Sequence, residues 1–95
     1  MVVQHVTGKN IGHVMLYALS TCVWCKKTKA LLDGLGVEYY YEYVDLLQDD
    51  DKEKEKVIKT LERWNPSRNF PTLVINDSKC IVGFKENEIR ETLKP

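Results

Sequence analysis

Two cysteines three positions apart stand where a short apolar run gives way to a helical pattern, and this junction constrains the fold most. The apolar run covers residues 14 to 19, and the thiols belong to Cys22 and Cys25. A buried strand that leads directly into a helix would deliver both thiols to the first helical turn. Backbone N–H groups there have no partner within the helix, so they would stabilise a thiolate on Cys22. Cys25, one turn later, could then attack a mixed disulfide formed at Cys22.

The length and net charge of the chain limit the number of domains and the classes of partner that we expect. The chain has 95 residues and a formal net charge of zero, with 14 basic and 14 acidic side chains. This length suits one core, so we expect a single domain over residues 1 to 95, in which residues 1 to 13 are an N-terminal extension. The balanced charge argues against a nucleic-acid partner.

Cysteine usage and the N-terminal residues indicate the compartment. The chain has three cysteines, and two of them lie too close together to close a large loop, which argues against a secreted disulfide framework. The first 19 residues contain no continuous apolar segment of the kind found in signal peptides and membrane spans. We therefore expect a cytoplasmic monomer with no membrane partner.

The rest of the sequence predicts an alternation of strands and helices. Ser20 or Thr21 is the expected N-cap of the helix that carries the cysteines. Two positions stay open for Trp24, namely the inner face of that helix and, because it lies between the thiols, the exposed side. The expected elements are strands over 14–19, 37–45, 72–75 and 79–82, a helix from 23 to the glycines at 34 and 36, a helix from the acidic run 49–51 to Trp64, and a last helix over 86–93.

This order resembles the glutaredoxin branch of the thioredoxin fold over roughly residues 14 to 94. The cysteine pair follows the first strand, Pro71 lies where that family has a cis-proline facing the sulfurs, and Gly83 and Phe84 lie where it has a glycine turn before the last helix. The resemblance implies a thioredoxin-like α/β fold with a four-stranded mixed sheet and three flanking helices. The N-terminal stretch has no counterpart in the family, and we expect residues 2 to 6 to add an extra strand.

The resemblance also implies an activity and a site. A glutaredoxin-like enzyme is a small thiol–disulfide oxidoreductase in which Cys22 attacks a disulfide of a protein or small molecule and Cys25 resolves the mixed disulfide. Such a protein serves electron transport and cell redox homeostasis without a tightly bound cofactor. The implied substrate-binding residues are Thr21, Val23, Trp24, Arg68, Phe70, Pro71, Gly83 and Phe84.

Several positions depart from the family pattern and leave three electron donors open. Glutaredoxins commonly have Cys-Pro-Tyr-Cys, whereas Val23 replaces the proline here. Ala18 or Leu19 stands in place of the basic residue of glutathione-using members, and Lys85 and Glu86 stand in place of an acidic pair. With Val23 in the motif and the stretch Gly83-Phe84-Lys85, the chain also resembles the redoxins of ribonucleotide reductase, which thioredoxin reductase reduces. The donor is therefore glutathione, another low-molecular-weight thiol or an enzyme of the thioredoxin-reductase type.

Metal binding is the competing interpretation of the cysteine pair. Cys22 would then hold an iron–sulfur cluster or zinc across a dimer, with a thiol cofactor completing the shell. Zinc within one chain needs four ligands, and only Cys80, His5 and His13 remain to join the pair. We interpret Cys80 as a buried strand residue and the two histidines as surface residues, so the predicted site contains no metal.

Overall fold

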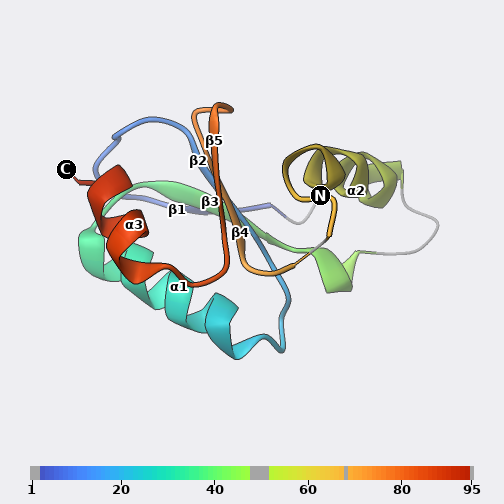
Figure 1. Cartoon of the computed structure of the whole chain (residues 1–95), viewed down its shortest axis with the longest axis horizontal. Coiled ribbons are helices and arrows are strands. Elements are labelled where there is room, and N and C mark those ends of the chain that lie inside the picture. Colours follow the sequence, from blue (N-terminus) through green and yellow to red (C-terminus); the bar gives the residue numbers. More distant parts are fainter. Residues whose placement is uncertain (1–2, 48–51, 68, 95) are drawn as a thin grey trace.

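The computed structural model describes residues 3–47, 52–67 and 69–94. These residues form a five-stranded mixed sheet in the order β1-β3-β2-β4-β5, with α1 and α3 on one side and α2 on the other (Figure 1). The expected thioredoxin-like fold and the extra N-terminal strand are confirmed. The elements are β1 (Gln4–Val6), β2 (Val14–Ala18), α1 (Val23–Leu35), β3 (Tyr39–Tyr43), the 3₁₀ helix η1 (Val44–Leu46), α2 (Lys52–Trp64), β4 (Thr72–Ile75), β5 (Lys79–Val82) and α3 (Glu86–Thr92).

Strands β2 and β3 are parallel and are joined by α1, as the strand–helix–strand pattern predicts. Their register pairs Met15 with Tyr40 and Ala18 with Tyr43. β4 is antiparallel to β2 and to β5, and β1 is antiparallel to β3. The carboxyl ends of β2 and β3 therefore lie side by side at the same end of the sheet. The cysteine pair follows shortly after β2.

Alternate residues of the strands belong to two separate apolar clusters, one on each face of the sheet. Leu16 of β2 is fully buried in the larger cluster, which also includes residues of α1 and α3. Its neighbour Tyr17 points to the opposite face, where it packs in a smaller cluster with Leu61 of α2. The larger cluster consists of Val14, Leu16, Ala18, Cys25, Leu31, Leu32, Val37, Tyr39, Leu73, Ile75, Ile81, Ile89 and Leu93.

Helix α1 begins at Val23, as expected, but its cap differs from the expected one. The N-cap is Cys22, so the prediction of Ser20 or Thr21 as N-cap was wrong. Residues at helical spacing such as Cys25, Thr28 and Leu32 face the core, and Trp24 is 54% exposed. Of the two positions expected for Trp24, the structure shows the exposed one.

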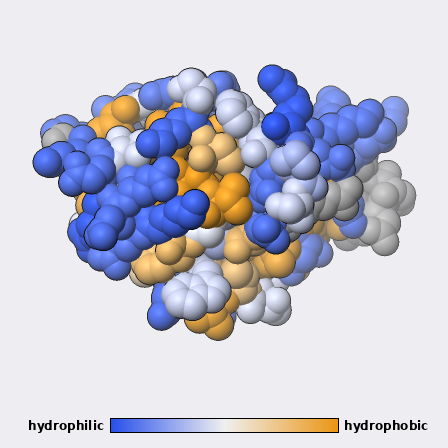
Figure 2. All heavy atoms as spheres, in the orientation of Figure 1, coloured by the Kyte–Doolittle hydropathy of each residue, from blue (hydrophilic) through white to orange (hydrophobic). Residues whose placement is uncertain are grey.

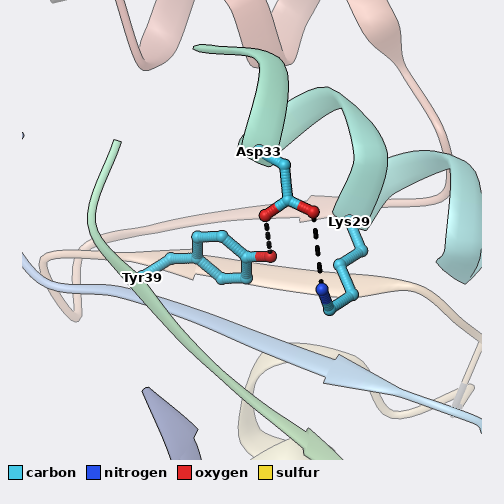
Figure 3. A network of polar contacts seen from close by, with 3 residues as sticks. All are labelled: Lys29, Asp33 and Tyr39. Atoms are coloured by element: carbon cyan, nitrogen blue, oxygen red, sulfur yellow. Dashed lines mark hydrogen bonds and ion pairs between the residues drawn. The ribbon is translucent and has the colours of Figure 1, made fainter. Parts of the chain in front are cut away.

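The far end of α1 is fastened to β3 through an aspartate. Asp33 accepts a hydrogen bond from the Tyr39 hydroxyl at 2.6 Å and faces the Lys29 ammonium at 3.4 Å (Figure 3). Burial raises the pKa of Tyr39, and the hydrogen bond to Asp33 adds to this effect. One residue past the helix, Gly36 adopts a left-handed conformation with φ 69° and ends it, as expected.

The remaining elements largely follow their predicted patterns. The ion pair between Glu55 and Lys59 of α2 is present at 3.2 Å, whereas the predicted acidic first turn at residues 49–51 lies outside the described residues. The hairpin of β4 and β5 turns through two residues with positive φ. Ile89 of α3 and Leu93, which follows that helix, are fully buried. Within the described residues, no helix is long and apolar enough to cross a membrane.

Candidate active site at the start of α1

The Cys22 sulfur sits at the N-terminus of α1 and takes part in its capping. The residue is extended, with φ −87° and ψ 118°, and its Sγ accepts a hydrogen bond from the backbone N–H of Cys25 at 3.2 Å. Its carbonyl oxygen accepts from the N–H of Lys26 at 3.1 Å. Cys22 is half-buried and carries a free thiol. A sulfur that receives a helix N–H is stabilised most when it is a thiolate, which is the form that attacks disulfides.

Cys25 has a different environment from Cys22. Its side chain is only 2% exposed and belongs to the larger apolar cluster. Burial raises the pKa of Cys25 to about 12, with further contributions from the hydrogen bond to Cys22 and the charge of Asp45. The two thiols thus differ in burial and in hydrogen bonding, as an attacking and a resolving thiol should.

We expect iodoacetamide to label Cys22 and to spare Cys25 in the native protein. With a pKa of about 12, only about one Cys25 in ten thousand is a thiolate at pH 8, and this fraction rises tenfold for each unit of pH. Peptide mapping by mass spectrometry, with a Cys80→Ser variant to remove the third thiol, should find one label at neutral pH and a second as the pH approaches 12. Equal labelling of both cysteines at pH 8 would contradict this assignment.

Pro71, directly before β4, and Gly83, directly after β5, are neighbours at the open end of the hairpin. The Phe70–Pro71 peptide bond is cis, as the resemblance implies. The N–H of Gly83 donates to the carbonyl oxygen of Pro71 at 2.8 Å, and Gly83 has a φ of 87°, a conformation that L side chains rarely adopt. The carbonyl oxygen of Gly83 in turn accepts from the N–H of Lys85 at 3.1 Å. These bonds hold the glycine turn against the proline.

An apolar groove of about 210 Å³ lies beside this turn, lined by Trp24, Phe70, Gly83 and Phe84. The rings of Trp24 and Phe84 stack with centroids 5.9 Å apart, and the Lys27 ammonium lies 4.7 Å from the centroid of the Trp24 ring. Hydrophobic surface extends from β5 in the middle of Figure 2 down toward the start of α1. Four of the predicted substrate-binding residues therefore come together from three separate parts of the chain.

The other predicted substrate-binding residues are placed differently. Thr21 is exposed in the turn before Cys22, and Val23 is 62% exposed at the first position of α1. Pro71 is buried, next to the groove residue Phe70. Arg68 lies outside the described residues. The structure thus brings the aromatic and glycine positions into one groove and leaves the side chain of Val23 at the surface.

The positions that depart from the family pattern occupy particular places in the fold. Ala18 is 2% exposed at the end of β2, and its side chain carries no charge. Lys85 is exposed at the N-cap of α3, and Glu86 forms an ion pair of 2.9 Å with Arg90 one turn along that helix. A side chain already paired on its own helix is less available to an ammonium group of a ligand.

Sequence reasoning missed an aspartate next to the thiol loop. Asp45 accepts hydrogen bonds from the backbone N–H of Ser20 at 2.9 Å and from the Ser20 hydroxyl at 2.5 Å. The following residue, Leu46, is 58% exposed. The available signal was the parallel pairing of the two strands, because residues that follow the ends of neighbouring parallel strands meet at one edge of a sheet.

The described residues contain no group of three or more His, Cys, Asp or Glu side chains that could hold a metal ion. Cys80 is half-buried on β5, and burial raises its pKa. His5 and His13 are exposed and contact the ring of Tyr40, with centroids 4.6 Å and 5.5 Å away. A zinc site that joined these three side chains to the cysteine pair is therefore not assembled within one chain.

Comparison with known proteins identifies relatives along most of the chain. The model of the glutaredoxin family matches residues 14–81. A glutaredoxin-like 8.6 kDa protein of the rubredoxin operon of Clostridium pasteurianum is 32% identical over 82 residues, which are 85% of this chain and 97% of that protein. The glutaredoxin of Methanosarcina mazei Go1 has a TM-score of 0.89 at 55% identity, covering 100% of this chain and 90% of that one. The methanoredoxin of Methanosarcina acetivorans has a TM-score of 0.85 at 55% identity, covering 93% and 90%.

Proposed function

This chain belongs to the glutaredoxin family, whose members generally act as thiol–disulfide oxidoreductases, and on that premise we propose that it reduces disulfides with Cys22 and Cys25. One observation carries the proposal above the others. The Cys22 sulfur receives the N–H of Cys25 at the start of α1, while the Cys25 thiol itself is buried. This asymmetry supports attack by Cys22 and resolution by Cys25.

In the first step, the Cys22 thiolate attacks one sulfur of the substrate disulfide. A bond forms between that sulfur and Cys22, the original sulfur–sulfur bond breaks, and the other half of the substrate leaves as a thiolate that takes a proton from water. The N–H of Cys25 helps to hold the attacking sulfur in its charged form before this step. The result is a mixed disulfide at Cys22.

In the second step, Cys25 gives up its proton and its thiolate attacks the Cys22 sulfur. The second half of the substrate leaves as a thiol after taking a proton, and a Cys22–Cys25 disulfide remains. The substrate has gained two electrons and two protons. Both electrons come from the pair, one proton comes from Cys25 and the other from water. Burial raises the pKa of Cys25, which keeps its proton in place in the resting protein, and in this step that proton passes to the leaving sulfur of the substrate, directly or through water.

The groove beside Pro71 is the substrate-binding surface in this proposal. An extended segment of a disulfide-containing protein could lie along the backbone at Pro71 as a short added strand, with side chains against the aromatic rings of Trp24, Phe70 and Phe84. Thr21, Val23 and Gly83 would flank the same segment, and Arg68 remains a predicted contact for a substrate carboxylate.

The oxidised pair must be reset by two electrons from a donor, which we propose is glutathione, another small thiol or an enzyme of the thioredoxin-reductase type. The buried Ala18 and the paired Glu86 weaken the case for glutathione, because neither offers it a free charge. A panel that offers each donor to the oxidised protein, with thiol titration as the readout, tests the function and identifies the donor together.

We expect at least one donor to restore two thiols in the pair and to sustain turnover of a disulfide substrate. A protein that no donor reduces, or that reduces no disulfide, would contradict the proposal. Anaerobic purification adds a second control, because a brown protein with visible absorbance would instead favour an iron–sulfur carrier, whereas a colourless dithiol protein favours the oxidoreductase.

A further inference from the structure

Asp45 fastens the loop that carries Cys22 to the neighbouring strand. β2 and β3 run parallel with Ala18 paired to Tyr43, so Ser20 and Asp45 each follow their strand by two residues and lie opposite one another. Both carboxylate oxygens of Asp45 are used, one by the Ser20 N–H at 2.9 Å and the other by the Ser20 hydroxyl at 2.5 Å. Hydrogen bonds to a carboxylate are stronger than those between neutral groups.

The fastened residue lies inside the turn that leads to the thiol. The N–H of Cys22 donates to the carbonyl oxygen of Leu19 at 3.2 Å, which closes a tight turn around Ser20 and Thr21. Cys22 follows this turn directly as the N-cap of α1. Its sulfur can accept the N–H of Cys25 only while its backbone keeps that extended conformation. The position of Ser20 therefore helps to set the position of the sulfur.

We propose that Asp45 is a positioning residue for the redox pair: through its two hydrogen bonds to Ser20 it holds the Leu19–Cys22 turn so that Cys22 keeps the N–H of Cys25. This inference rests on the proposed function, in which the Cys22 thiolate is the attacking group. The bond from the Ser20 hydroxyl lowers the pKa of Asp45, so the carboxylate stays charged at neutral pH. Asp45 is also the last of the causes that raise the pKa of Cys25, so its charge acts on that thiol only weakly.

The variants Asp45→Ala and Ser20→Ala test this role by removing one side of the link. Loss of the positioned N–H should slow alkylation of Cys22 by iodoacetamide at pH 7 about threefold to tenfold in Asp45→Ala. Ser20→Ala keeps its backbone N–H on Asp45 and should show a smaller decrease. Asp45→Asn retains an acceptor for that N–H, so it should recover part of the rate. In a thiol–disulfide redox buffer, the equilibrium ratio of reduced to oxidised cysteine pair should also change, and the size of this change should rank the variants in the same order as the alkylation rate.

Asp33→Ala is the matched control. Asp33 ties α1 to β3 through one carboxylate oxygen, which accepts from the Tyr39 hydroxyl, while its other oxygen pairs with Lys29 of the same helix, and this link lies at the far end of α1 (Figure 3). Asp33→Ala should lower the melting temperature while leaving the alkylation rate of Cys22 within twofold of the native value. An unchanged or faster rate in Asp45→Ala, or an equal slowing in Asp33→Ala, would overturn the inference. Neither readout requires a substrate to be reduced, so failure of the proposed function would be seen separately in the disulfide-reduction assay.

Discussion

Replacing Cys22 by serine should abolish disulfide reduction, lowering the rate by at least about a hundredfold. The reason lies in the site itself, because Cys25 is 2% exposed and its pKa is raised to about 12, so it cannot replace Cys22 as the attacking thiol. A serine hydroxyl at the same N-cap would keep the helix start and would not form a disulfide. The rate of reduction of a model disulfide by each variant is the measurement.

Cys80→Ser is the control for this loss. Cys80 is half-buried on β5, outside the groove and the helix start, so its replacement should leave the rate within about twofold of the native value. Melting curves of both variants should remain close to that of the native protein. Appreciable reduction by the Cys22→Ser variant would show that another thiol attacks and would remove the basis of the mechanism.

Replacing Cys25 by serine should have the second largest effect, because it stops the cycle at the mixed disulfide. Cys22 keeps its sulfur at the start of α1 and the N–H of residue 25, so the first attack still occurs. No thiol in the pair then remains to displace the bound half of the substrate. Mass spectrometry of the intact variant, after exposure to a disulfide and removal of excess reagent, should find about one adduct per chain at Cys22.

The adduct should disappear when an external thiol is added, which would leave the variant with monothiol activity only. Native protein treated in the same way serves as the comparison and should carry no adduct. A Cys25→Ser variant that turns over as fast as the native protein without an external thiol would contradict the resolving role. An adduct on Cys80 instead of Cys22 would contradict the attacking role.

Local patterns were enough to predict most of the fold. The apolar run of β2, the left-handed stop at Gly36 and the alternation along β3 each depend on residues close together in the chain, so each element appears near its predicted position. The groove was predicted through the resemblance, because Trp24 and Phe84 lie far apart in sequence and meet only in the folded chain.

The start of α1 shows why the rest could not be predicted. Ser20 and Thr21 are both better N-caps than cysteine by local preference, yet Cys22 occupies that place. The hydroxyl and N–H of Ser20 are bound by Asp45, which lies 25 residues away. Periodicity within one helix cannot reveal a contact that depends on the register of two parallel strands. Trp24 lies seven residues before the buried Leu31, so helical periodicity alone favours the inner face, whereas its ring stacks on Phe84 and the residue is 54% exposed.

The proposed mechanism depends most on Cys22 and Cys25 forming one dithiol–disulfide pair. Its most direct test is a single turnover, in which the fully reduced protein meets one equivalent of a protein or small-molecule disulfide and is then quenched in acid and mapped by mass spectrometry. We expect a Cys22–Cys25 disulfide in about one equivalent, a reduced Cys80 and a substrate that has gained two thiols. A disulfide that includes Cys80, or two free thiols at Cys22 and Cys25 beside a reduced substrate, would rule this mechanism out.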